Sequence, residues 1–136
     1  MKNRYHIPLI FLFSLSFLFC EAQDFETVFA KVDEKPQFPG GQEEMFKFIK
    51  QKMEYPYYAK TKKIHGKVYV TFTVKADGSI VRKKVMRGIG GGCDDEALRV
   101  INLMPKWIPG KLNLRPVNTI FSISFLFKSK GAGRSF

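Results

Sequence analysis

A strand–turn–strand pattern in the middle of this 136-residue chain restricts its fold more than any other feature. Apolar residues alternate with other residues from Gly66 to Lys75, and those that share one face are Val68, Val70, Phe72 and Val74. Asp77-Gly78 follows, and this pair supplies the positive φ angles that a tight hairpin needs. Ser79 to Arg87 is expected to return as a second strand with one solvated, basic face. The pattern therefore predicts an antiparallel hairpin.

Two segments before the hairpin are predicted to be helical. Gln42 to Met53 follows the chain breaker Pro39-Gly40-Gly41 and carries apolar residues at spacings of three and four. Its first turn is acidic and its last turn is basic, which suits the helix dipole. Pro56 to Lys60 is expected to begin a second, short helix, because proline is tolerated at the first helical position.

The segments after the hairpin predict one more helix and one more strand. Asp94 or Asp95 is expected to cap a helix that runs to about Met104. Val117 to Lys128 alternates a Phe-rich face with a face that carries Ser122 and Ser124, as expected for a strand. The order of elements predicts an α+β fold, in which a three-stranded antiparallel sheet packs against two helices in two layers.

Trp107 lies between the last predicted helix and the last predicted strand. Pro105 precedes it and Pro109 follows it, so the chain must turn here. A large apolar side chain at such a turn is expected to be buried and to anchor the turn to the core.

The first 22 residues have the order of a secretory signal. Lys2 and Arg4 precede an apolar run of 13 residues, Ile7 to Phe19, and small residues lead to a predicted cleavage after Ala22. The run is shorter than the roughly 20 residues that a spanning helix needs. Two alternatives stay open: an uncleaved membrane anchor, and lipid attachment at Cys20, which the bulky residue before this cysteine disfavours.

Composition and charge narrow the classes of function. Hydrophobic residues make up 45% of the chain, which is enough to build a core. The 23 Lys and Arg residues outnumber the 12 Asp and Glu residues, giving a formal net charge of +11. Such a charge suits nucleic acid, anionic lipid or an acidic protein. However, the basic residues are dispersed, they form no nucleic-acid motif, and the chain is expected to be exported, so we predict no nucleic-acid partner.

Groups that could carry catalysis or bind a metal are few. After the leader, His65 is the only histidine and Cys93 the only cysteine, and zinc would need three or four ligands. Gly88 to Gly92 lacks the Lys and Ser/Thr ending of a phosphate-binding loop. We interpret His65 as a solvated loop residue and Cys93 as a packing thiol, and we predict neither an enzyme nor a cofactor or metal site. An enzyme or anion-binding domain that uses these residues is the alternative from another class.

Several short motifs, taken in order along residues 28–128, resemble the TonB C-terminal domain in the form found in Bacteroidetes-type bacteria. They are Val28-Phe29, Val32 to Gly41, Tyr55-Pro56 with Ala59, Gly66-Lys67-Val68, Asp77 to Ile80, Asp95 to Val100, Met104 to Trp107, Pro109-Gly110 and Pro116-Val117. The resemblance implies a folded domain over residues 39–128. An extended arm over 23–38 would precede it, and a flexible tail over 129–136 would follow it.

The resemblance also implies a function in transport. TonB-like proteins work with ExbB and ExbD to pass proton-motive energy to outer-membrane transporters. Their C-terminal domain pairs with a short transporter segment as an extra strand. The resemblance therefore implies a partner-binding site, whose residues are Tyr55, Pro56, Ile120, Ser122, Ser124 and Leu126. A homodimer formed through sheet edges is the competing use of the same strand.

The chain departs from a full energy transducer in its N-terminal part. A transducer needs a permanent membrane helix and a long Pro-rich segment to cross the periplasm. Here fewer than 20 residues separate Ala22 from the folded motifs, and fully extended they reach about 60 Å. We therefore predict a periplasmic binding module for segments of outer-membrane transporters. A minimal, membrane-anchored transducer that works with ExbB and ExbD is the alternative.

Overall fold

The central hairpin forms as the alternation predicts. In the computed structural model, which describes residues 26–128, β1 (Gly66–Val74) pairs antiparallel with β2 (Ile80–Arg87). Gly78 adopts a φ of +88° in the turn, and its N–H donates to the Lys75 carbonyl at 2.8 Å. The glycine thus supplies the positive φ that the Asp-Gly pair predicts.

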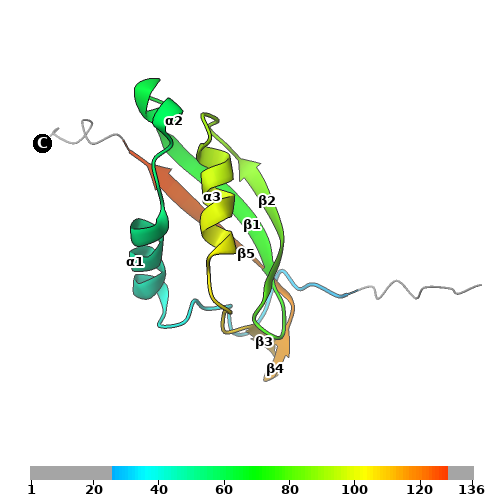
Figure 1. Ribbon diagram of the computed structural model, residues 1–136. Helices are drawn as coiled ribbons and strands as arrows, with labels where there is room; N and C mark the ends of the chain where they lie inside the picture. Colours follow the sequence, from blue (N-terminus) through cyan, green and yellow to red (C-terminus); the bar gives the residue numbers. More distant parts are fainter. Residues whose placement is uncertain (1–25, 129–136) are drawn as a thin grey trace, which may run out of the picture.

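The last strand, β5 (Thr119–Phe127), completes the main sheet. It pairs antiparallel with β1, so the strand order is β2-β1-β5 and β5 lies at an edge (Figure 1). The β1–β5 register runs from Val74–Thr119 to Gly66–Phe127 without a shift. The β1–β2 register shifts twice, and Arg82 has a φ of +52° within β2. The sheet therefore has one regular edge and one irregular edge.

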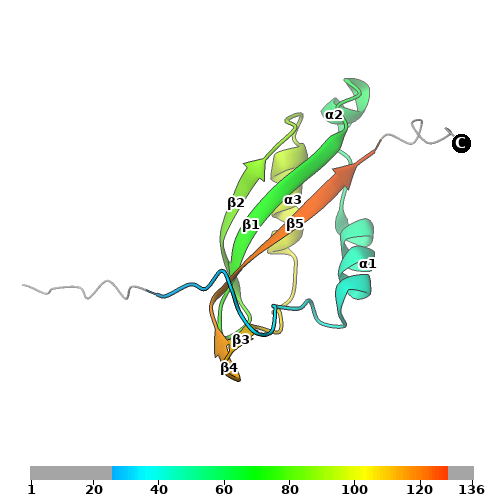
Figure 2. The same cartoon turned by 180° about the vertical axis from the view of Figure 1, so that it is seen from behind.

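Three helices are present in the described part of the chain. They are α1 (Gln42–Lys52), α2 (Tyr57–Thr61) and α3 (Cys93–Asn102). Figures 1 and 2 show α3 across the middle of the sheet and α1 beyond its β5 side, which leaves the opposite face of the sheet without helices. This arrangement is the expected two-layer α+β fold.

The expectation that Asp94 or Asp95 caps α3 is wrong. Gly92 occupies the N-cap position in the left-handed conformation, and no side chain makes a capping hydrogen bond. The Asp94 carboxylate instead accepts a hydrogen bond from the Ile89 N–H at 2.9 Å, so it fixes the glycine loop rather than the helix start.

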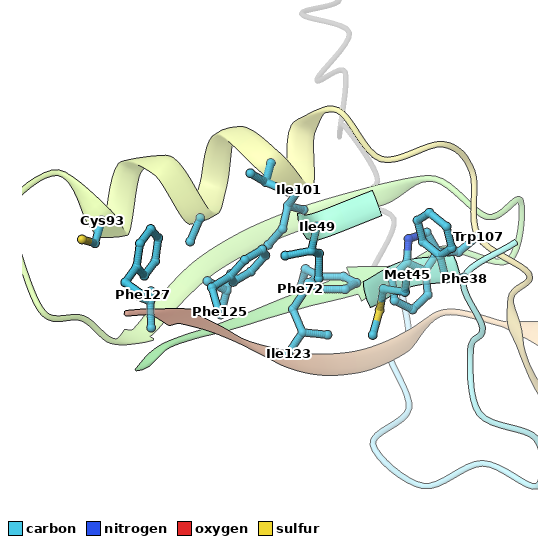
Figure 3. Packing of buried hydrophobic residues seen from close by; sticks show 14 of the residues in the cluster. Phe38, Met45, Ile49, Phe72, Cys93, Ile101, Trp107, Ile123, Phe125 and Phe127 are labelled. Atoms are coloured by element: carbon cyan, nitrogen blue, oxygen red, sulfur yellow. The ribbon is translucent and has the colours of Figure 1, made fainter. Parts of the chain in front are cut away.

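The core lies between the sheet and the helices (Figure 3). Phe72, Phe125 and Phe127 from the sheet are fully buried. Trp107 is only 3% exposed, which confirms that it is buried. Its ring centroid lies 5.8 Å from that of Phe38, 5.4 Å from that of Phe72 and 5.2 Å from that of Phe121. These edge-on aromatic contacts anchor the turn after α3 to the sheet and to Phe38 of the preceding segment.

The sequence did not predict a second, two-stranded sheet. β3 (Gly110–Leu112) pairs antiparallel with β4 (Arg115–Val117). Asn113 and Leu114 between them have φ angles of +50° and +65°, as a tight hairpin requires. The predicted strand from Val117 to Lys128 is consequently two elements, because Val117 ends β4 and β5 begins at Thr119.

Candidate functional site: the edge of β5

The side of β5 that faces away from β1 exposes unpaired backbone groups. In an antiparallel pair, successive residues direct their N–H and C=O groups alternately toward and away from the partner strand. The Ile120 N–H donates to Phe29 on the outer side, at 3.1 Å, so Ser122, Ser124 and Leu126 also direct their backbone groups outward. Within residues 26–128, no backbone hydrogen bond reaches these three residues from that side.

Figure 2 shows the face of the sheet that the helices leave uncovered. The side chains of the same alternate positions lie on this face, because those of Ile123, Phe125 and Phe127 point into the core. Ile120 is 43% exposed and Leu126 is 41% exposed, and both serines between them are also exposed. The Thr71 and Ser122 hydroxyl oxygens lie 3.1 Å apart across β1 and β5. No residue from Thr119 to Phe127 is charged. The edge is thus regular, and no charged side chain of β5 itself would repel an added strand.

The other edge of the sheet is protected against pairing. Arg82, Lys83, Lys84 and Arg87 are all exposed along β2. The shifts in the β1–β2 register and the positive φ of Arg82 mark a bulge. Lysines and bulges are features by which proteins block edge-to-edge pairing. Among the described strands of this sheet, β5 therefore offers the edge suited to a partner.

The N-terminal arm, residues 26–38, occupies the beginning of the β5 edge. Phe29 forms a parallel bridge with Thr119, and its N–H donates to the Asn118 carbonyl at 2.8 Å. The Glu26 carboxylate lies 3.0 Å from the Lys75 ammonium, and this hydrogen-bonded contact lowers the pKa of Glu26. The open part of the edge consequently begins at Ser122.

After Phe29 the arm leaves β5 and runs beside the second sheet. Glu34 forms an antiparallel bridge with Lys111, and Gln37 forms one with Ile108. The sequence alone does not place the arm at the candidate site, because local alternation between residues 28 and 32 does not indicate which strand an extended segment will contact.

Tyr55 lies at the opposite end of β5. Its ring packs edge-on against Phe127, with the centroids 5.8 Å apart, and its hydroxyl donates to the Ile64 carbonyl. Burial raises the pKa of Tyr55, and the neighbouring Cys93 adds to the shift. Pro56 is the N-cap residue of α2. Both residues thus lie near the end of the β5 edge, where the Tyr55 hydroxyl is already engaged in a hydrogen bond within the domain.

The residues that a catalytic interpretation would need do not form a reactive group. His65 is exposed, and its Nδ1 lies 3.0 Å from the Lys63 carbonyl oxygen. Cys93 is fully buried, and burial together with the nearby Asp94 and Glu96 carboxylates raises the pKa of its thiol. A raised pKa keeps the thiol protonated and unreactive. Across residues 26–128, no cluster of three or more His, Cys, Asp or Glu side chains could hold a metal ion.

A comparison with known proteins identifies the family of this chain. Residues 51–129 match the family described as the Gram-negative bacterial TonB protein C-terminal region, so the match includes β1, β2, α3 and β5. This chain belongs to the TonB C-terminal family. Members of this family are transport-associated domains of the cell envelope, and they interact with outer-membrane transporters.

Two NMR solution structures of the Helicobacter pylori TonB C-terminal domain are similar to this chain. The shorter form is 27% identical, with 61% of this chain and 89% of that chain covered and a TM-score of 0.42. The longer form is 28% identical, with 68% and 89% covered and a TM-score of 0.45. No curated protein matches the chain. Over residues 26–128, no helix is both long enough and apolar enough to span a bilayer.

Proposed function

We propose that this TonB-family chain is a periplasmic binding module that takes up a segment of an outer-membrane TonB-dependent transporter as a fourth strand beside β5. The observation that carries the proposal is the open, uncharged edge from Ser122 to Leu126. Ser122, Ser124 and Leu126 each offer one outward N–H and one outward C=O. A partner strand that pairs with these groups needs no particular side chains, since backbone groups supply the contacts.

The open part of the edge sets the length of the partner segment. Five residues, 122–126, lie between the arm at one end and the Tyr55–Phe127 contact at the other. At about 3.3 Å per residue, this stretch matches an extended segment of about five residues. Tyr55 and Pro56 lie where the far end of that segment would leave the sheet.

Delivery of the module to the periplasm is the second part of the proposal. The predicted leader, residues 1–22, lies outside the described residues, and we propose that it is removed on export. In the alternative, the leader is retained as a membrane anchor, and the protein works with ExbB and ExbD as a minimal energy transducer.

Proline at position 124 tests the strand addition. The Ser124 N–H points away from β1, so Ser124→Pro removes an outward donor without removing a β1–β5 hydrogen bond. Ser124→Ala is the matched control, because it loses the hydroxyl and keeps the N–H. We expect the wild type and Ser124→Ala to capture an outer-membrane transporter from envelope extract, whereas Ser124→Pro should not. Mass spectrometry identifies the captured protein.

Two further measurements make the test decisive. Circular dichroism checks that Ser124→Pro keeps the fold, and sedimentation measures self-association. If the folded proline variant captures the transporter as well as the wild type does, β5 is not the recognition edge. If Ser124→Pro abolishes self-association and no variant captures a transporter, the edge serves a homodimer instead.

A further inference from the structure

Two adjoining hollows lie at the arm end of the open β5 edge. The first, which we call the arm hollow, has a volume of about 280 Å³ and lies between the arm, at residues 30–32 and 35–36, and β5 residues 119–122. The second, the tryptophan pocket, has a volume of about 360 Å³, and its apolar lining includes Phe38, Met45, Trp107 and Phe121. Lys35, Pro36 and Phe121 line both hollows, so the two are neighbours.

The lining of the tryptophan pocket is held in place by the core. Figure 3 shows Trp107, Phe38 and Met45 gathered at one end of the buried cluster, away from Cys93 and Phe127. The Trp107 ring is packed against Phe38 of the arm and Phe121 of β5. A pocket with rigid aromatic walls and one adaptable methionine suits a large apolar side chain, since little order has to be gained on binding.

The rim of the hollows is basic. Lys31 lines the arm hollow and Lys35 lines both hollows. In the part of the chain that the structure describes, neither lysine forms an ion pair with a carboxylate, whereas Lys47, Lys75 and Lys111 do. Two such cations beside an apolar pocket are complementary to a carboxylate that accompanies an apolar side chain.

We propose that the two hollows form an anchor site for the flank of the peptide that pairs with β5. One large apolar side chain of the peptide enters the tryptophan pocket, and an adjacent carboxylate lies between Lys31 and Lys35. This inference rests on the proposed function, because the occupant is the same peptide. It commits to that occupant because the hollows and the edge are continuous at Phe121 and Ser122, where the arm has left β5. Backbone pairing accepts many sequences, so the anchor site would supply the selectivity.

A peptide library tests the proposal without assuming a sequence. The probe is a displayed library of random 12-residue peptides, selected on protein produced from the full chain and purified from the envelope. We expect selected peptides to share one large apolar residue with Asp or Glu beside it, at one end of an extended segment. Replacing that apolar residue by alanine should weaken binding roughly tenfold to a hundredfold.

Variants of the protein separate the two halves of the anchor site. Gln42 is an exposed residue at the pocket wall, so Gln42→Phe should fill the pocket and remove the preference for the apolar residue. Lys35→Glu should weaken binding about threefold or more at low salt, through loss of the carboxylate contact. Lys84→Glu on β2 changes the net charge equally at the opposite edge and should have no effect. Trp107 is the only tryptophan of the chain, so its emission should respond to the anchored peptide and not to the alanine variant.

The outcomes distinguish this inference from the proposed function. One outcome is that the selected peptides fail to bind Ser124→Pro, yet share no apolar position and leave the Trp107 fluorescence unchanged. That result would overturn the anchor site and support the strand addition. Equal effects of Lys35→Glu and Lys84→Glu overturn the carboxylate contact. Peptides that bind Ser124→Pro as tightly as wild type, or a library that yields no binder, overturn both proposals.

Discussion

One added methyl group at Gly78 is expected to destabilise the fold strongly. A Cβ atom on Gly78 would lie 2.2 Å from the Trp107 carbonyl oxygen, far inside contact distance. The clash is with backbone, so no side-chain rotation relieves it. The Gly78 carbonyl also accepts a hydrogen bond from the Trp107 N–H at 2.8 Å, and the φ of Gly78 is +88°. The hairpin turn and the Trp107 segment must therefore separate in Gly78→Ala.

Three costs add up in this variant. A left-handed conformation costs a residue with a Cβ about 1–2 kcal/mol. Loss of the Trp107–Gly78 hydrogen bond costs about 1 kcal/mol, and forced displacement of a packed segment costs about 1–3 kcal/mol. We expect the free energy of unfolding to fall by about 3–6 kcal/mol, which is a large share of the roughly 5–15 kcal/mol typical of a domain.

Gly92→Ala is the matched control. Gly92 has a φ of +86°, but its added Cβ would meet only Pro56, at an ordinary 3.4 Å. The free energy of unfolding of Gly92→Ala should fall by about 1–2 kcal/mol, because only the backbone angle is unfavourable. Urea unfolding followed by circular dichroism and Trp107 fluorescence measures both variants. Equal losses for the two glycines would refute the argument, because the close approach to Trp107 would then contribute nothing.

Three other predictions concern the core, the leader and the arm. Trp107→Ala should lower the free energy of unfolding by about 3–5 kcal/mol, and a loss below about 1 kcal/mol in chemical denaturation would contradict its role as a core anchor. N-terminal sequencing of the envelope protein should begin at Gln23, whereas an intact first methionine or a lipidated cysteine would exclude the predicted cleavage. The contact between Glu26 and Lys75 lowers the folded-state pKa of Glu26 below its ordinary 4.5. The stabilisation of the folded arm by this ion pair is therefore fully present above that pH and is lost as the pH falls through the lowered pKa. Exchange of the Ile120 amide hydrogen, measured against pH, should therefore become less protected in acid in the wild type and should lose this dependence in Glu26→Gln.

The sequence predicted the main sheet well because its strands alternate over many residues. Nine residues in β1 and nine in β5 carry a period of two, and a slip by one residue would turn every buried side chain outward. The face that carries Ser122 and Ser124 could be read for the same reason. The glycine of the Asp77-Gly78 turn was predictable because few residues accept its backbone angles.

What the sequence did not predict depends on contacts between distant segments. The strands β3 and β4 are only three residues each, and Leu114 in their turn is not a residue type that favours a positive φ. Asp94 is a good capping residue by type, but the Ile89 N–H in the loop before it competes for the same carboxylate. The hollows beside β5 combine residues from the arm, α1 and the turn at Trp107, and no local pattern links these segments.

The difference between the two sheet edges limits what this molecule can assemble into. A protein with two pairing-competent edges can add copies at both sides and grow into an open filament. Among the described strands of the main sheet, the basic, bulged β2 edge opposes such growth, which leaves β5 as the edge suited to pairing. A second copy on β5 would give a closed pair with two-fold symmetry, and a bound peptide would exclude that pair by occupying the same backbone groups. If the proposed strand addition at β5 holds, the main sheet would take one partner segment per chain.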